Sequence, residues 1–145
     1  MEHSEEGEVP LLDLMALIYR AVNFHSQKKL YDLTKTQFLI LAALYRSVSL
    51  NMTEISEFIS SSKEQATRAV APLADRGLIR RIEHPDNRKH VYVELTEAGK
   101  ELITELRGEM RRRFMERVDS VLSEEEKAEL SSSAETLAAI LSKLC

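Results

Sequence analysis

Residues 60–99 read SSSKEQATRAVAPLADRGLIRRIEHPDNRKHVYVELTEAG, and this stretch decides the fold. Ser62 and Gln65 have the spacing of a capping box, in which each side chain bonds the backbone N–H of the other residue at a helix start. Gly77 predicts the end of that helix, because glycine adopts the left-handed conformation without a Cβ clash. We therefore expect a helix from Ser62 to Gly77.

A second, shorter helix is expected just before this one. Asn51 is a candidate N-cap with Glu54 three residues later, and the serines at 60–61 interrupt the helix that follows. Its apolar residues, expected to be buried, are Ile55, Phe58 and Ile59. Two helices joined by so tight a turn are typical of a helix-turn-helix.

Two short segments with strand character come after Gly77. They are residues 78–83 and residues 91–95, and the second alternates cleanly as Val91, Val93 and Leu95. The sequence HPDNRKH between them contains proline, aspartate and asparagine, which favour turns. This pattern predicts a β-hairpin with a basic tip.

Two helices are expected nearer the N-terminus. In residues 10–30 an apolar stripe with spacings of three and four is formed by Leu11, Leu14, Met15, Ile18, Val22 and His25. Thr34 and Gln37 have capping-box spacing, and Leu33 with Phe38 occupies the positions of a hydrophobic staple. This next helix is expected to end near Arg46, with an apolar side made of Phe38, Leu41, Leu44 and Tyr45.

Two more helices are expected at the C-terminal end, one capped by Thr96 and one opened by Ser123 with Glu126. The seam of the first consists of Ala98, Leu102, Leu106, Met110, Phe114, Val118 and Val121 or Leu122. The stripe of the second consists of Leu130, Leu137, Ile140, Leu141 and Leu144. These surfaces exceed what one small domain can cover, so we expect a homodimer. The fold class is mainly α with a small β-hairpin wing.

The composition is that of an ordinary soluble globular domain, with 145 residues, 43% hydrophobic and 30% charged. No apolar run approaches the roughly 20 residues that span a bilayer, and residues 1–8 are acidic, unlike a signal peptide. The single cysteine, Cys145, forms no disulfide framework, so a cytoplasmic location is expected. An unactivated tail thiol is favoured over an oxidant sensor for this residue.

The net charge is −4, yet the segment 63–89 has a local balance of +3, which leaves −7 for the rest. Its seven basic residues are Lys63, Arg68, Arg76, Arg80, Arg81, Arg88 and Lys89, and its four acidic ones are Glu64, Asp75, Glu83 and Asp86. An acidic body with one basic stretch fits a single DNA-facing surface. The arginine run at 111–113 is instead expected to pair with Glu109 and Glu116 on a solvated helix face.

The helix beginning at Ser62 is expected to enter a major groove of DNA with its N-terminal side chains facing base edges. Lys63, Gln65 and Arg68 offer hydrogen bonds to bases or phosphates, and the hairpin tip reaches a neighbouring minor groove or backbone. The predicted DNA-binding residues are Ser62, Lys63, Gln65, Thr67, Arg68, Arg88 and Lys89.

Residues 60–99 resemble the signature region of the MarR (multiple antibiotic resistance regulator) family. The resemblance rests on Thr67-Arg68, Arg76-Gly77-Leu78, Asp86 with Arg88, Leu95-Thr96 and Gly99, and LTKTQFLILAAL at 33–44 resembles the family's second helix. It implies one domain over residues 1–145, in which 1–32 and 97–145 dimerise and 33–96 bind DNA. It also implies a repressor of a palindromic operator, released by a small ligand, metal or oxidant.

Two residues depart from this pattern. Pro72 removes the amide that would bond the Arg68 carbonyl and is expected to kink the helix, although by phase it lies away from the core side. Glu64 places a carboxylate near DNA phosphates, where it is repulsive unless it accepts a hydrogen bond from cytosine N4.

Enzyme chemistry is not expected, because the four glycines form no phosphate-binding loop and no serine has a plausible base. No cofactor or metal is expected either, since His3, His25, His84 and His90 lack ligand spacing. His25 shares a face with Ile18 and Val22 and is expected to pack there. The alternative function is a winged-helix module that binds a protein partner and has lost DNA binding.

Overall fold

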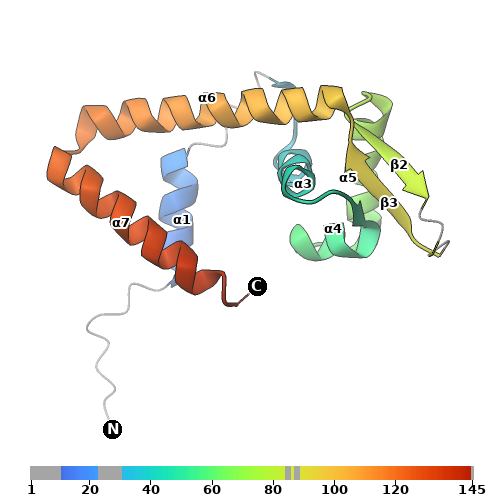
Figure 1. Ribbon diagram of the computed structural model, residues 1–145, viewed down its shortest axis with the longest axis horizontal. Coiled ribbons are helices and arrows are strands. Elements are labelled where there is room, and N and C mark those ends of the chain that lie inside the picture. The colour runs from blue at the N-terminus through green and yellow to red at the C-terminus, as the bar shows by residue number, and fades with distance from the viewer. Residues whose placement is uncertain (1–10, 23–30, 84–85, 87–88, 145) are drawn as a thin grey trace, which may run out of the picture. The chain divides into compact units, whose positions relative to one another are not determined.

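The structure is a computed structural model that describes residues 11–22, 31–83, 86 and 89–144 (Figure 1). Its elements are α1 (Leu11–Val22), α3 (Lys35–Arg46), β1 (Leu50–Asn51), α4 (Met52–Phe58), α5 (Lys63–Asp75), β2 (Ile79–Glu83), β3 (Val91–Leu95), α6 (Glu97–Val121) and α7 (Glu124–Leu141). The predicted class is confirmed: the fold is mainly helical with a small antiparallel wing. The chain divides after Gly108 into two compact units, here called the N-terminal and the C-terminal unit.

Three predicted capping boxes form in both directions. At α3, the Thr34 hydroxyl accepts a bond from the Gln37 backbone N–H at 3.1 Å, and the side-chain Oε1 of Gln37 accepts one from the Thr34 N–H at 3.0 Å. The complete pairs are Thr34 with Gln37, Asn51 with Glu54, and Ser123 with Glu126. Each satisfies N–H groups that lack a partner at a helix start. The starts of α3, α4 and α7 were therefore predictable.

At α5 only half of the predicted capping box forms. The Ser62 hydroxyl accepts from the Gln65 N–H at 3.2 Å, but the Gln65 carboxamide bonds the hydroxyl of Ser61. An extra serine before the cap competes for the glutamine, and the spacing rule does not consider it. The helix continues past Pro72 to Asp75, and Pro72 is exposed, as its phase predicted.

The end of α5 agrees with the prediction from Gly77, whose φ is +70°. The Leu78 N–H donates to the Leu73 carbonyl at 2.9 Å, and the Gly77 N–H donates to the Ala74 carbonyl at 2.9 Å. These are the two bonds of a Schellman motif, which requires a left-handed residue at the position of Gly77.

The predicted hairpin is confirmed, and a third strand joins it. The sheet order is β1-β3-β2, all antiparallel, with Ile79 opposite Leu95 and Arg81 opposite Val93. β1 pairs Leu50 with Val93. This strand was not predicted, because two residues are too few to show an alternating pattern.

The core of the N-terminal unit is formed by α3, α4, α5, the sheet and the start of α6. Its buried side chains include Leu33, Phe38, Ile40, Leu41, Leu44, Ile55, Ala66, Val70, Leu73, Ile79, Val93, Leu95, Ile103 and Leu106. Two assignments were wrong: Tyr45 is 46% exposed and Phe58 is 54% exposed. Tyr45 instead presents its ring to the Arg107 guanidinium, whose centre lies 4.7 Å from the ring centroid. Phe58 is the last residue of the short α4.

In the first turn of α6, the buried position lies one residue later than predicted. Ala98 is exposed, whereas Gly99, Ile103 and Leu106 are buried. Further along, Val118 is buried as predicted. In α7 no residue is fully buried: of the predicted stripe, Leu137 and Leu141 are half-buried, and Leu130, Ile140 and Leu144 are exposed. Of the helix expected over 10–30, residues 23–30 lie outside the described residues, and the assignment of His25 falls there.

A contact between the end of α5 and the start of α6 explains this shift. The Thr96 hydroxyl donates to the Gly77 carbonyl at 2.6 Å and accepts from the Gly99 N–H at 3.1 Å, while the Thr96 N–H donates to the Leu78 carbonyl at 3.1 Å. A Cβ on Gly99 would lie 2.0 Å from the Leu78 carbonyl oxygen. Only glycine fits here, so in the first turn of α6 residue 99 is the one that faces the core. We call this contact the Thr96 junction.

Gly99→Ala is expected to lower the free energy of unfolding by about 1–3 kcal/mol, because the added methyl group must displace a backbone carbonyl. Gly108→Ala in the same helix is the control. A Cβ there meets nothing within 4 Å, and the helix propensity of alanine is expected to add up to about 1 kcal/mol. Urea unfolding followed by circular dichroism measures the free energy of unfolding of both variants. Equal changes in Gly99→Ala and Gly108→Ala would contradict the close contact of Gly99 in the Thr96 junction.

Candidate nucleic-acid interface

The first two turns of α5 present polar side chains to solvent, as predicted. Lys63, Gln65 and Arg68 are exposed, while Ala66 and Val70 are buried against the rest of the N-terminal unit. The small Ala66 allows α5 and α4 to pack closely, which turns the opposite face outward. The structure therefore leaves Lys63, Gln65 and Arg68 accessible around the exposed side of α5.

Other predicted site residues have local bonds. Ser62 caps α5, so its oxygen is used at the helix start. The Thr67 hydroxyl donates to the Lys63 carbonyl at 2.8 Å, and so its proton is engaged within the helix. The Gln65 carboxamide is held by Ser61. Of these three side chains, Gln65 keeps the most free hydrogen-bonding capacity, because its amide carries two donors.

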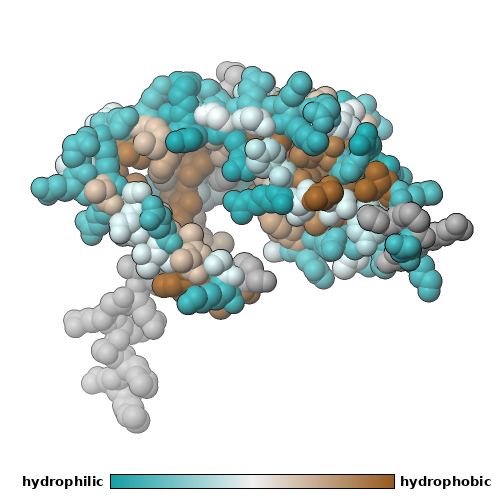
Figure 2. Space-filling model, in the orientation of Figure 1, coloured by the Kyte–Doolittle hydropathy of each residue, from teal (hydrophilic) through white to brown (hydrophobic). Residues whose placement is uncertain are grey.

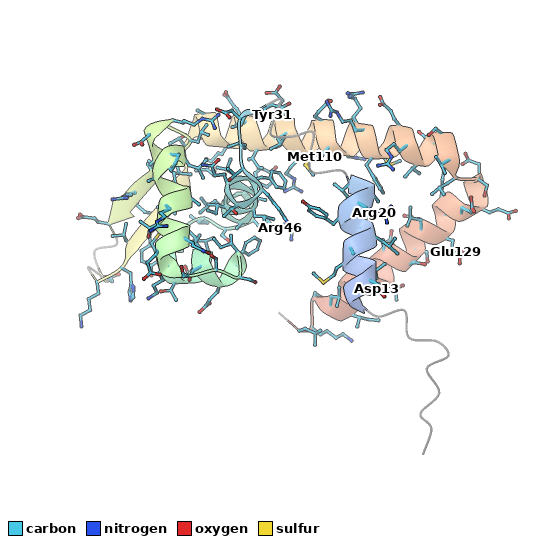
Figure 3. The ribbon with its side chains drawn as sticks, turned by 180° about the vertical axis from the view of Figure 1, so that it is seen from behind. Asp13, Arg20, Tyr31, Arg46, Met110 and Glu129 are labelled. Carbon is cyan, nitrogen blue, oxygen red and sulfur yellow. The ribbon has the colours of Figure 1, made fainter. Side chains whose placement is uncertain are left out.

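Arg76 and Arg80 belong to the basic stretch but are tied to the protein. Arg76 donates to the carbonyls of Asp32 at 3.0 Å and Tyr31 at 3.1 Å, just before α3. Tyr31, which contributes one of these carbonyls, is labelled in Figure 3. Arg80 pairs across the hairpin with Glu94, with Nε 2.5 Å from the carboxylate. Counting charges along the sequence could not reveal these partners.

The remaining cations are exposed. Within the part of the chain that the structure describes, no hydrogen bond or ion pair engages the side chains of Lys63, Arg68, Arg81 or Lys89. Arg88 lies outside the described residues. Arg81 was absent from the predicted site, but its side chain is exposed in β2, where the residue lies opposite Val93.

Glu64 lies beside these cations at the start of α5. Its own backbone N–H and then the Ser62 hydroxyl hold the pKa of this carboxyl below its usual range, and Arg68 and Lys63 act in the same direction. Glu64 therefore stays ionised near neutral pH. Its charge reduces the positive potential of this face and gives the helix one acceptor among donors.

The basic residues of the C-terminal unit behave differently. Arg112 binds Glu109 at 2.7 Å and Glu116 at 2.5 Å, and Arg113 binds Glu109 at 2.7 Å. The two arginines lower the pKa of Glu109 to about 2, with Arg112 the larger cause. The predicted pairing is thus confirmed for Arg112 and Arg113, two of the three arginines of the run. Figure 2 shows hydrophilic side chains along the visible side of α6.

No group of three or more histidine, cysteine, aspartate or glutamate side chains is placed to hold a metal ion among the residues that the structure describes. Among the described helices, none is both long and apolar enough to cross a membrane.

The sequence is similar to known regulators. The model of the MarR family matches residues 33–91. Two proteins of Bacillus subtilis, the uncharacterized HTH-type transcriptional regulators YhbI and YybA, are each 30% identical to the chain. The YhbI match covers 64% of this chain and 62% of YhbI, and the YybA match covers 68% and 67%. The chain thus spans less than two thirds of YhbI.

Solved structures share the fold. Wild-type MarR in its apo form from E. coli superposes with a TM-score of 0.77, covering 90% of this chain and 98% of that chain at 20% identity. The shared fold, the matched family residues and the two relatives lead to one conclusion: the chain belongs to the MarR family of winged helix-turn-helix transcriptional regulators.

Proposed function

We propose that this protein binds double-stranded DNA sequence-specifically, with α5 in a major groove and the hairpin tip at an adjacent minor groove or the backbone. The carrying observation is the set of exposed cations on α5 and the hairpin, Lys63, Arg68 and Lys89, for which no ion pair is present among the described residues. A helix fits the major groove of DNA. Cations placed there raise the affinity for DNA, because they release counterions from its phosphates. Gln65 and Arg68 supply the base-reading donors, and Lys63, Arg88 and Lys89 supply phosphate or minor-groove contacts.

The protein is proposed to act as a homodimer on a palindromic operator. Support comes from α7, where no residue is fully buried and Ile140 is 55% exposed, and from Val121 at the end of α6, which is 76% exposed. A second copy of the chain would cover such surfaces. In this arrangement 1–32 and 97–145 dimerise and 33–96 bind DNA.

The regulatory role is proposed from family membership. Most simply, the dimer blocks transcription at its operator and a small effector lowers its affinity for DNA. The experiment that tests the whole proposal is a selection from random-sequence duplexes followed by a gel-shift titration with the selected duplex. An absence of enrichment would favour the protein-partner alternative.

Lys89→Ala is expected to weaken binding to selected and scrambled duplexes alike, because phosphate contacts do not read sequence. Plots of log affinity against log salt should flatten by about 0.9 per lost contact, and by about 1.8 when both subunits lose one. Lys143→Ala, an exposed lysine of the C-terminal unit, is the control with the same charge change. If the slope of log affinity against log salt changes by only about 0.9 and light scattering shows a monomer, the proposed dimer is contradicted.

Arg68→Ala is expected to cost about 1–3 kcal/mol per base contact, doubled in a symmetric dimer, and to relax the preference at particular operator positions. The measurement is a gel-shift series against single-base variants of the selected duplex. If Arg68→Ala weakens binding to every variant of the duplex equally, this arginine contacts the DNA backbone, and its assigned role in reading bases is wrong.

A further inference from the structure

Arg76 connects two parts of the N-terminal unit that are distant in sequence. It is the C-cap of α5, and its guanidinium donates from one amino group to the Asp32 carbonyl at 3.0 Å and from the other to the Tyr31 carbonyl at 3.1 Å. Hydrogen bonds from a charged donor are about twice as strong as those between neutral groups. Two such bonds to consecutive carbonyls fix both the position and the direction of the backbone at residues 31–32.

The backbone at residues 31–32 has an unusual conformation. Asp32 has a φ of +50°, in the left-handed region, which costs energy for a residue with a Cβ. Leu33, the next residue, is buried, and Thr34 begins the capping box of α3. A conformation of this kind persists only where its surroundings impose it. The bonds from Arg76 and the burial of Leu33 together hold this turn in place.

The connections to both proposed dimerisation segments attach at the end of α5. The segment 1–32 ends at the carbonyls that Arg76 binds. The segment 97–145 begins beside the Thr96 junction, which holds the two residues that follow Arg76. Both attachments directly follow α5, the helix proposed to enter the major groove. The end of α5 thus fixes where both connections leave the DNA-binding part.

We propose that Arg76 is a positioning residue for operator recognition: by holding residues 31–32 against the end of α5, it sets which spacing between half-sites the dimer accepts. The inference rests on the proposed function and adds a residue outside the proposed DNA contacts. In a dimer, the separation of the two recognition helices must match that of the half-sites. One base pair more moves a half-site by about 3.4 Å and turns it by about 35°, so a looser connection tolerates spacings that a fixed one rejects.

Gel-shift titrations of the full chain compare the selected duplex with duplexes in which one base pair is inserted or removed between the half-sites. The ratio of the two affinities is here called the spacing discrimination. Arg76→Ala is expected to lower it at least about fivefold, because both subunits lose hydrogen bonds from a charged donor. Discrimination among single-base variants within a half-site should stay as in the wild type, because Arg76 lies at the opposite end of α5 from Gln65. A loss of stability alone would lower the active fraction and leave the ratio unchanged.

Arg46→Ala is the control with the same charge change, since Arg46 is an exposed arginine at the end of α3. It is expected to leave the spacing discrimination unchanged. Arg76→Lys keeps the charge but replaces the planar fork with a single ammonium group, and it is expected to retain part of the discrimination. This variant decides the matter should Arg76→Ala fold poorly by circular dichroism. Unchanged spacing discrimination in the Arg76 variants overturns the proposal, as does an equal loss in Arg46→Ala.

Failure of this inference is distinguishable from failure of the proposed function. If the wild type binds a selected duplex with two half-sites and the Arg76 variants keep its spacing discrimination, only the role of Arg76 is refuted. If the wild type enriches no duplex, or enriches a single half-site, then DNA binding or the dimer is refuted, and the role of Arg76 with it.

Discussion

The Thr96 junction constrains the whole N-terminal unit. A single hydroxyl joins the carbonyl of Gly77 to the N–H of Gly99, and the backbone of residue 78 contacts Gly99 where no side chain fits. Leu78 leads directly into β2, and Leu95 at the end of β3 directly precedes Thr96. The end of α5, both long strands of the wing and the start of α6 therefore meet at one point, so α5 and the wing cannot shift independently there.

The local distribution of charge, and not the net charge, bears on DNA binding. A chain with a net charge of −4 is a poor DNA-binding candidate by composition alone. Ion pairs neutralise Arg112 and Arg113 in the C-terminal unit, whereas Lys63, Arg68 and Lys89 have no such partner among the described residues. The junction connects the end of α5, the helix that carries Lys63 and Arg68, to the strands that lead to Lys89.

Local rules predicted the elements well because caps and turns depend on residues a few positions apart. The capping boxes at Thr34 and Ser123 and the left-handed Gly77 are examples. Features that depend on distant residues were missed. Arg76 was counted in the charge balance of the basic stretch, but it bonds carbonyls more than 40 positions earlier. Likewise β1 exists only because Leu50 pairs with Val93. Of the site, the exposed face of α5 was predictable, whereas which cations remain unpaired was not.

Thr96→Val tests the role of the junction most directly, because it removes the hydroxyl and keeps the shape of the side chain. Hydroxyl-radical footprinting on a selected duplex reports minor-groove and backbone contacts, with circular dichroism confirming that the variant is folded. If the junction fixes the wing relative to α5, the protections at the wing positions should weaken in the variant, and its affinity should fall. An unchanged footprint with wild-type affinity in a folded variant would contradict the account.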